Sequence, residues 1–504
     1  MKRMKKTILN ICAVAVSAVL LASCNLDLFP NSAIAYDEDG QLIQTASNLK
    51  SFENGILASY RSYQNGEFYM TEEVQLDGFN ATIDFGNNYG GVHKTDHNFT
   101  ATDYYVEDYW SYSYSAIKDY NIMIAACDNV PEAIAADARI VKGEAFFFRA
   151  ATYLNLARHF AKAYNASSAA TDLCVPLVLV YNQNEKPARA TVKAVYDQIK
   201  ADLDSAAVIL AGVAGKAGSN KPTIDAVNAM YARYYLDVAD NSNAAVYAHK
   251  VIDSGNYTLA ANAADMAKEY VDDAGKEAIL QLFISLTEFT GNAFDIWTLA
   301  TADKVYTEIF RPYYIPTKTL MDLYEATDLR LASWFDNSVY VLLSGSYYTG
   351  QFYTFTKFRG NPALTSSPIR NGRQAPKPFK IGEMYLIAAE AELASNPTAA
   401  KADLNALQIA RGATSTDATI ANVRNEWFKE TVGEGLRLSC LKRWGLGFNG
   451  RPGQTGAVAA NILQTGEVFT GKVLAADSNF LLWPIPSHEM KVNKNLVQNP
   501  GYVE

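Results

Sequence analysis

The sequence predicts a mainly α-helical protein in which paired helices form a scaffold and two irregular, aromatic-rich segments extend from it. Apolar residues recur at spacings of three and four along several stretches, which is typical of helices with one buried face. Two stretches form helix–turn–helix units, the first of roughly 33 residues, a length within the range of tetratricopeptide-like repeats. Residues 65–107 and 256–378 lack this periodicity and are rich in Gly, Pro and aromatic side chains. We therefore expect a helical frame that presents two long insertions.

The first element along the chain is a predicted lipoprotein signal peptide, residues 1–23. Four basic residues are followed by an apolar stretch, Ile8 to Leu21, which is shorter than the roughly 20 residues that span a bilayer as a helix. The stretch from Leu21 to Cys24 resembles a bacterial lipobox, in which Cys24 would carry the lipid and begin the mature chain. The alternative is an ordinary signal peptide that happens to contain a cysteine.

Helices are expected in three blocks, at about 40–64, 108–255 and 379–445. Threonines that precede apolar periodic stretches are predicted N-caps, and glycines that follow them are predicted helix ends. In the second block we expect helices at 108–128, at 137–163, from Val192 to Leu210 after Thr191, and a pair that begins after Thr223, turns at 240–242 and ends at Gly255. In the third block we expect a pair that starts at Ile381, restarts at Asn396-Pro397 and ends near Gly412.

The two insertions, 65–107 and 256–378, are expected to be loop-rich with short strands. Val339–Leu343 and Phe352–Phe358 look extended. Long irregular segments are either functional loops or disordered linkers, and the aromatic content argues against disorder. We expect a further closing segment over 446–504.

Charge and cysteine content exclude several classes of function. The full chain carries −9, and residues 1–23 hold four basic and no acidic residues, so the remainder carries −13. Such an acidic chain argues against nucleic-acid binding. Beyond the signal, Cys127, Cys174 and Cys440 lack the spacing of a metal ribbon or redox motif. We expect them to be buried as small hydrophobic side chains.

Six motifs, in order along the chain, resemble those of RagB/SusD-type lipoproteins, the surface components of nutrient-uptake systems in Bacteroidetes-type Gram-negative bacteria. They are Cys24 followed by Asn25-Leu26-Asp27, Trp110 to Asn121 (Trp-x3-Tyr-x2-Ile-x3-Asn), Gly143 to Ala150 leading to Tyr153, Val195 to Leu203, Glu434-Gly435-x-Arg437 leading to Lys442-Arg443-Trp444-Gly445, and Trp483 to Pro486 closing through Gln498 to Tyr502. Cys440 departs from the pattern, because the family usually has an acidic residue three positions after this arginine. Gly433 is also unusual, and we expect both to alter a local scaffold contact and not the ligand site.

The resemblance implies one SusD-like domain over 24–504, with about four tetratricopeptide-like helix pairs and an irregular side that carries the ligand site. It implies a lipid-anchored protein of the outer membrane that faces the cell exterior. Such proteins act as lids over a SusC-like TonB-dependent transporter, capture oligosaccharides, or peptides in some branches, and have no catalytic activity.

Ligand-contact residues are expected in the two insertions. Sugar sites combine aromatic faces, which lie against C–H surfaces, with amides or carboxylates that reach hydroxyls. The candidates are Phe79, Asn80, Asp84, Asn87 and Tyr89 from the first insertion, and Phe294, Trp297, Tyr313 and Tyr314 from the second. Trp110, Trp444 and Trp483 belong to scaffold motifs and are assigned to the core instead.

Other chemistries are less well supported by the sequence. Gly445, Gly447 and Gly450 match a dinucleotide fingerprint by letter, but no strand precedes them. His93 and His97 have helical spacing for a metal pair, but we expect a surface loop there. We expect no metal and no cofactor, although the Asp84–Asn88 loop could supply oxygen ligands to calcium. A glycoside hydrolase remains the enzyme alternative, because its two carboxylates need not be close in sequence.

Overall fold

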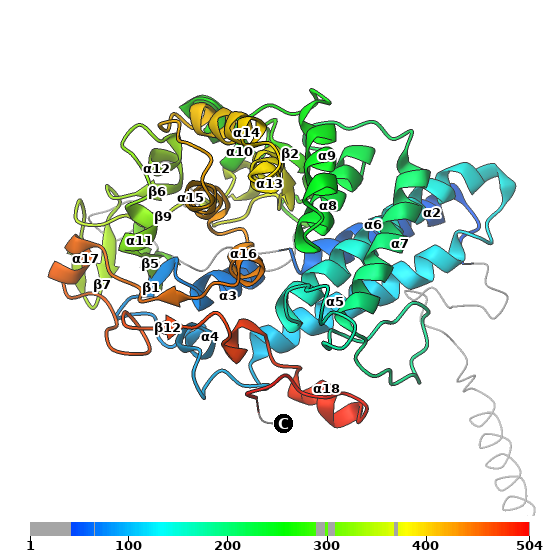
Figure 1. Cartoon of the computed structure of the whole chain (residues 1–504), viewed down its shortest axis with the longest axis horizontal. Helices are drawn as coiled ribbons and strands as arrows, with labels where there is room; N and C mark the ends of the chain where they lie inside the picture. The colour runs from blue at the N-terminus through cyan, green and yellow to red at the C-terminus, as the bar shows by residue number, and fades with distance from the viewer. Residues whose placement is uncertain (1–41, 65, 289–297, 301–307, 367–370, 503–504) are drawn as a thin grey trace, which may run out of the picture.

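The computed structural model of the chain describes residues 42–64, 66–288, 298–300, 308–366 and 371–502, with the run 298–300 described by its backbone only. Cys24 and the predicted signal peptide lie outside these residues. Within them the chain is mainly helical, as predicted, with a few short strands (Figure 1).

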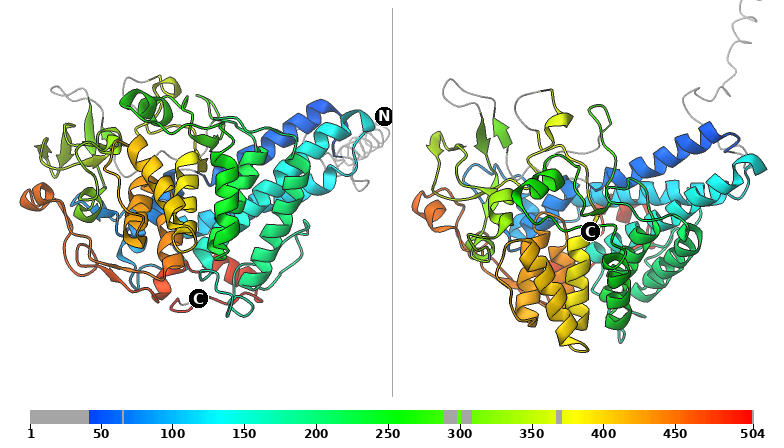
Figure 2. Two further views of the ribbon diagram at one scale, coloured as in Figure 1. Left: turned by 45° about the horizontal axis from the view of Figure 1, so that its top comes forward. Right: turned by 90° about the horizontal axis from the view of Figure 1, so that it is seen from above.

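The long helices pack side by side and form the helical side of the molecule; in Figure 2 the green and yellow helices run roughly parallel, and the blue helix α2 lies at an angle to them. Each packs on the next in the order α2, α5, α6, α7, α8, α9, α13 and α14, and α15 packs on α13. These helices are α2 (Ala46–Ser62), α5 (Tyr104–Ala126), α6 (Ala135–Phe160), α7 (Val192–Leu210), α8 (Ile224–Asp237), α9 (Asn241–Ile252), α13 (Ile381–Glu392), α14 (Pro397–Ala410) and α15 (Ile420–Thr431). The predicted tetratricopeptide-like scaffold is therefore present.

Side-chain caps fix where these helices begin. Thr191 and Thr223, both predicted caps, accept hydrogen bonds from the backbone N–H groups of Ala194 and Ala226. Such a bond satisfies one of the otherwise unpaired N–H groups of a first helical turn. Asp103 caps α5, which therefore starts four residues before the expected boundary.

The irregular side holds short elements that pair over long sequence separations. The strands pair as β1 (Phe79–Ala81) with β5 (Tyr314–Pro316), β2 (Ala278–Leu280) with β10 (Phe379–Lys380), β6 (Phe335–Asp336) with β9 (Thr354–Phe355), and β11 (Phe448–Asn449) with β12 (Val473–Leu474), while β3 (Thr298–Ala300), β4 (Ile309–Arg311), β7 (Val341–Leu343) and β8 (Ser346–Tyr348) form one small sheet. Short helices complete this side: α3 (Gly66–Gln75), α4 (Gly90–Lys94), α10 (Ala263–Tyr270), α11 (Lys318–Met321), α12 (Leu329–Trp334), α16 (Arg437–Trp444), α17 (Thr455–Ala459) and α18 (Ser487–Val492). Both stretches expected to be extended contain a strand, β7 and β9.

Among the described residues, five helices lie wholly within the segments expected to be loop-rich, namely α4, α10, α11, α12 and the longest of them, α3. Its residues from Met70 to Gln75 are all buried. A helix enclosed on every side needs no polar face, so it shows no amphipathic periodicity in its sequence. This explains why the pattern of spacing did not reveal it.

Two hydrophobic cores support the two sides. The larger core runs along the long helices, and the second lies under the irregular side around Phe79, Tyr314 and Trp334. Buried ion pairs join the sides, because the guanidinium of Arg411 at the end of α14 contacts both Glu277 and Glu430.

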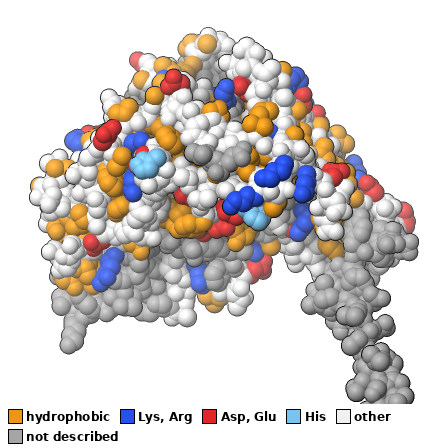
Figure 3. Space-filling model, turned by 90° about the horizontal axis from the view of Figure 1, so that it is seen from below, with side chains coloured by type: hydrophobic (Ala, Val, Ile, Leu, Met, Phe, Trp, Pro, Cys, Tyr) orange, Lys and Arg blue, Asp and Glu red, His pale blue; other side chains and the backbone are white. Residues whose placement is uncertain are grey.

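The closing segment returns to the helical side. The indole of Trp483, fully buried, donates a hydrogen bond to Gln75 and packs against Tyr109 and His159. Trp110 is also buried, so both tryptophans have the scaffold role expected for them. Figure 3 shows the face seen from below, where hydrophobic side chains and charges of both signs are interspersed.

Two expectations about single residue types can be checked directly. Cys127, Cys174 and Cys440 are all unpaired and buried, as predicted. No helix in the described ranges combines the length and apolar character that a membrane crossing requires.

Candidate ligand-binding cleft

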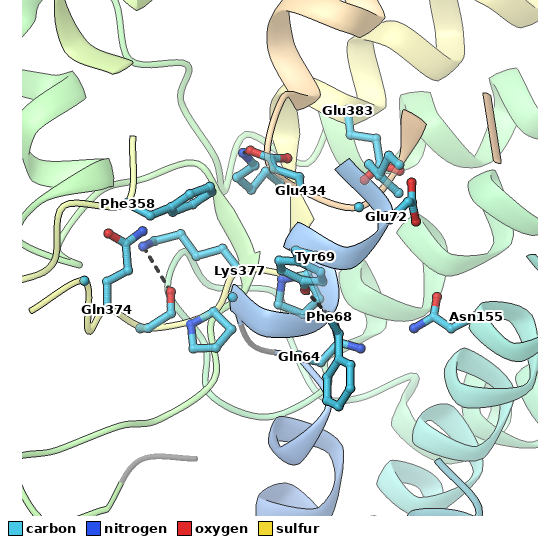
Figure 4. A pocket seen from close by; sticks show the side chains of 18 of the residues that line it. Gln64, Phe68, Tyr69, Glu72, Asn155, Phe358, Gln374, Lys377, Glu383 and Glu434 are labelled. Atoms are coloured by element: carbon cyan, nitrogen blue, oxygen red, sulfur yellow. Dashed lines mark hydrogen bonds and ion pairs between the residues drawn. The ribbon is translucent and has the colours of Figure 1, made fainter. Parts of the chain in front are cut away.

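A cleft lies where the helical side meets the irregular side. It encloses about 1210 Å³ of space, part of it open to solvent. The start of α3 runs through it, α5, α6 and α8 supply one wall, and the loop 372–378 with Phe358 supplies the other. Figure 4 shows Phe358 and Gln374 on one side of α3 and Asn155 on the opposite side. The site is therefore built from segments that are distant in sequence.

Aromatic side chains form the middle of the cleft. Phe68 packs edge-on against Tyr109 with ring centroids 5.2 Å apart, and Tyr109 lies 4.6 Å from the His159 ring. Tyr69 is half-buried, and its hydroxyl donates a hydrogen bond of 2.6 Å to Gln64 Oε1. Phe68 and Tyr109 are buried, so the aromatic ring that a ligand can reach is that of Tyr69, beside the side-chain amide of Gln64.

Two further amides face the cleft from opposite walls. Asn155 on α6 is half-buried, and Gln374 belongs to the loop 372–378. The Oε1 atom of Gln374 is buried and has no hydrogen-bond partner among the described residues. A buried acceptor without a partner costs free energy, so this atom is suited to accept a ligand hydroxyl.

Ion pairs surround Glu434 at the floor of the cleft. Lys357 Nζ lies 2.6 Å from Glu434 Oε1, and Lys380 pairs with the same oxygen. Burial opposes ionisation of Glu434, but the two ammonium groups outweigh it and hold the pKa of Glu434 below its usual range. Burial also lowers the pKa of Lys357 to about 8. The negative charge of Glu434 at the floor is therefore already balanced by lysines of the protein.

Three further charged side chains of the cleft, Arg233, Lys377 and Glu72, also have partners within the protein. Arg233 Nη2 donates to Glu383 Oε2 at 2.6 Å, and Lys377 Nζ lies 2.6 Å from Asp273 Oδ1. Glu72 accepts a hydrogen bond of 2.8 Å from the backbone N–H of Leu438 and lies 3.1 Å from His159 Nε2. These contacts hold the walls together and engage most of the charged side chains that line the cleft.

Four of the predicted ligand-contact residues are enclosed in the second core. Phe79 packs against Phe355, Tyr89 stacks on Tyr105, and Tyr314 donates a hydrogen bond of 2.6 Å to the Asn88 carbonyl. Asn80, at the centre of β1, is 1% exposed. Protein atoms cover these side chains, so burial argues against ligand contact by Phe79, Asn80, Tyr89 and Tyr314.

Three other candidates reach solvent outside the cleft. Asp84 and Asn87 are exposed and Tyr313 is half-buried. Asp84 Oδ2 accepts a hydrogen bond of 2.6 Å from the backbone N–H of Ser344, and Asn87 accepts one of 3.0 Å from Lys94. Ligand contact by these three residues stays a prediction. Phe294 and Trp297 lie outside the described residues.

Several weaker motifs have structural explanations. His93 is fully buried in α4, where its ring contacts the Val74 carbonyl and Arg451, so the expectation of a surface loop was wrong for this residue. His97 is exposed. In the glycine motif, a Cβ on Gly447 would lie 1.8 Å from the Leu474 carbonyl oxygen, which makes glycine necessary for the approach of β11 to β12.

The two departures from the family motif also fall in the scaffold. Cys440 is buried, and its thiol lies 3.9 Å from the guanidinium of Arg443. Gly433 has a φ of +78°, and a Cβ there would lie 2.7 Å from the Phe355 ring. Neither residue lines the cleft.

The predicted insertions supply part of the cleft, but none of the predicted contact residues that the structure describes lines it. Tyr69 lies in the first predicted insertion and Gln374 in the second, while Asn155 lies in a predicted helix. No spacing connects these residues, because three separate elements bring them together. A half-exposed polar position on the buried helix α6, such as Asn155, is the one signal that could have indicated a role.

Comparison with known proteins agrees with this architecture. Residues 26–236 match a family model described as starch-binding associating with outer membrane, and residues 305–502 match the model of the SusD family. Among curated proteins, none matches the chain.

Solved structures share the fold over nearly the whole chain. A SusD superfamily protein from Bacteroides thetaiotaomicron is 23% identical with a TM-score of 0.75, over 90% of this chain and 100% of that one. A sugar-binding protein from Bacteroides vulgatus, described as putative, is 22% identical with a TM-score of 0.71, over 92% and 100%. A laminarin-binding SusD-like protein is 20% identical with a TM-score of 0.68, over 91% and 100%. Together with the two family models, these likenesses show that the chain belongs to the SusD/RagB family.

Proposed function

We propose that this protein is a cell-surface, lipid-anchored glycan-binding protein that captures oligosaccharides and delivers them to a SusC-like TonB-dependent transporter of the outer membrane. The observation that carries the proposal is the cleft, in which a half-buried tyrosine lies beside amides on both walls. Family membership supports it, and one protein of the same fold is described as laminarin-binding. The lipid at Cys24, the transporter and the outward orientation belong to this proposal.

The chemistry of the cleft favours a neutral ligand. Aromatic faces bind the apolar C–H surface of a sugar ring, and amides exchange hydrogen bonds with its hydroxyls. Lys380, Arg233 and Lys377 each have a carboxylate partner within the protein. A charged peptide would have to compete with these internal ion pairs, whereas a neutral glycan would leave them intact.

We propose binding without catalysis. A glycosidase needs a carboxylic acid that keeps its proton near neutral pH, opposite a second carboxylate. Among the carboxylates that line the cleft, Glu434 has a lowered pKa, and Glu383 and Glu72 are held by Arg233 and by the Leu438 N–H. Glu434 therefore stays ionised near neutral pH, and the carboxylates of Glu383 and Glu72 are engaged in contacts within the protein.

The test is a calorimetric screen of the chain starting at Asn25 against polysaccharides and peptide digests. We expect binding to one glycan class, with no release of reducing ends at high protein concentration. Binding to peptides alone would overturn the glycan assignment, and release of reducing ends would overturn the non-catalytic one.

Variants then locate the site. Tyr69→Ala and Gln374→Ala should each weaken glycan binding by about 1–3 kcal/mol, or roughly 5- to 150-fold, since each removes a contact to the ligand. Tyr104→Ala is the matched control, because Tyr104 is 57% exposed and does not line the cleft. Asp84→Ala and Tyr313→Ala report on the predicted loop residues. If only these last two variants lose affinity, the ligand binds on the loops and not in the cleft.

A further inference from the structure

A cluster of potential metal ligands lies on the helical side, apart from the residues of the cleft. It brings together His249 near the end of α9, Glu392 at the last residue of α13 and Asp403 in α14. These three helices are neighbours, since α13 packs on both α9 and α14 (Figure 1). The residues are far apart in sequence, so no motif announced them, and the sequence analysis expected no metal.

The distances within the cluster suit a small tetrahedral ion. His249 Nε2 lies 3.4 Å from Glu392 Oε2 and 3.5 Å from Asp403 Oδ2. All three ligand atoms lie within 4.8 Å of one another. Nitrogen and oxygen ligands about 2.0–2.2 Å from a tetrahedral Zn²⁺ are roughly 3.4 Å apart. Two edges of the cluster therefore already have the length that zinc coordination requires.

Asp403 provides a second and independent sign of a bound cation. The residue is 8% exposed, and its Oδ2 atom is buried and accepts no hydrogen bond from any described residue. Two carboxylates, those of Glu392 and Asp403, face the single imidazole of His249. The cluster thus holds more negative charge than the single imidazole can balance.

We propose that His249, Glu392 and Asp403 bind one Zn²⁺ ion that clamps α9 to the α13–α14 hairpin. One imidazole and two carboxylates are ligands that zinc accepts, and three protein ligands leave a fourth position for water. The side chain of His249 is 30% exposed, so solvent can reach that position. The rival explanation is that a proton, and not a metal ion, balances the carboxylates. That proton would either charge His249, which would then form ion pairs with both carboxylates, or be shared between Glu392 and Asp403.

The experiment titrates Zn²⁺ into metal-free, untagged protein and follows the heat of binding. We expect one ion per chain and a rise in Tm of about 2–4 °C at saturation, since a ligand that binds only the folded state stabilises it. Co²⁺ should occupy the same site and give the visible absorption of a four-coordinate ion. Mg²⁺ and Ca²⁺ at the same concentration should not displace it, because they prefer more oxygen ligands.

His249→Ala and Asp403→Asn should each weaken Zn²⁺ binding by at least about tenfold, the loss already typical of removing an outer-shell partner. His488→Ala is the control, because His488 is exposed elsewhere and should bind as wild type does. Circular dichroism checks that each variant is folded, and Glu392→Gln replaces any that is not. The proposal is overturned if wild type binds no Zn²⁺, or if His249→Ala binds it equally well.

Discussion

Glu73, which lies in α3 next to the cleft residue Glu72, has a raised pKa. Burial, and then the neighbouring Glu72, raise its pKa to about 8, although it accepts a hydrogen bond of 3.2 Å from the backbone N–H of Gly435. The residue is 1% exposed. In the folded protein it therefore keeps its proton at a pH where an unfolded chain would release it.

Glu73→Gln should make the stability of the protein less dependent on pH. Since the folded pKa is raised, the folded state binds more protons than the unfolded state between about pH 4.5 and 8, and the free energy of unfolding falls as the pH rises through this window. Glutamine cannot ionise, so the variant should be about 1–3 kcal/mol more stable than wild type at pH 8, and little changed at pH 4.

The measurement is urea denaturation of both proteins at a series of pH values. Glu132→Gln is the matched control, because Glu132 is exposed and should leave the profile as in wild type. Parallel profiles for Glu73→Gln and wild type would show that Glu73 is ionised in the folded state.

For single residues, the sequence did not distinguish ligand-contact side chains from core side chains. Phe79, Tyr89 and Tyr314 have the residue types of a sugar-binding surface and lie in aromatic-rich insertions, yet all three are buried. An irregular side of this size needs its own core, and aromatic side chains build that core as readily as they bind sugars. Composition alone cannot distinguish the two roles.

At the scale of the helices, the close contact between α6 and α7 depends on a glycine, Gly143. A Cβ on Gly143 would lie 2.6 Å from Ile209 Cγ2 and 3.1 Å from Leu210 Cγ. Gly143 belongs to a motif that the sequence analysis recognised, and the structure gives its physical reason.

Gly143→Ala should destabilise the protein by about 1–3 kcal/mol, because the added methyl group must push the two helices apart. This exceeds the gain of roughly 0.5–1 kcal/mol that alanine brings to a helix interior. Gly55→Ala in α2 isolates that gain, since nothing lies within 4 Å of a Cβ at Gly55, and it should be stabilising. The test compares Tm values by calorimetry, and a stabilised Gly143→Ala would mean that α6 and α7 separate without cost.

Element prediction succeeded for the long, capped, amphipathic helices, and failed for the enclosed helix α3 and for short helices within the insertions, such as α10. The caps at Thr191 and Thr223 were found because a polar side chain precedes a periodic apolar stretch. The helix α3 was missed because its buried residues include Glu72, Glu73 and Gln75, so it has no apolar stripe for the spacing pattern to reveal. These groups are tolerated inside because Leu438, Gly435 and Trp483 donate hydrogen bonds to them.

At the scale of the whole molecule, the predicted division into a helical frame and an irregular side matches the arrangement of elements. What the sequence could not predict is the way the two sides are joined. That junction consists of charged residues from distant segments, such as Arg330 of α12 with Glu426 and Glu430 of α15. Partners of this kind become neighbours only in the folded chain, so no local pattern predicts them.

Arg411 is a second buried arginine in this junction, and it makes five hydrogen bonds. Its guanidinium is fully buried, and it donates hydrogen bonds to both carboxylate oxygens of Glu277, to both of Glu430 and to the Ala260 carbonyl. It therefore links the end of α14 to the irregular side and to α15.

Arg411→Met should destabilise the whole protein by about 3–5 kcal/mol, because the buried carboxylate of Glu277 loses its cation and that of Glu430 keeps only Arg330. Calorimetry should show a lower Tm and, since the junction is weakened, a transition that broadens or splits as the two sides unfold separately. Lys401→Met is the matched control: Lys401 pairs with Asp417 at 2.7 Å, but both side chains are more than half exposed, and such pairs contribute at most about 1 kcal/mol. If Arg411→Met unfolds in one sharp transition close to that of Lys401→Met, the two hydrophobic cores are held together by apolar contacts and not by the buried charges between them.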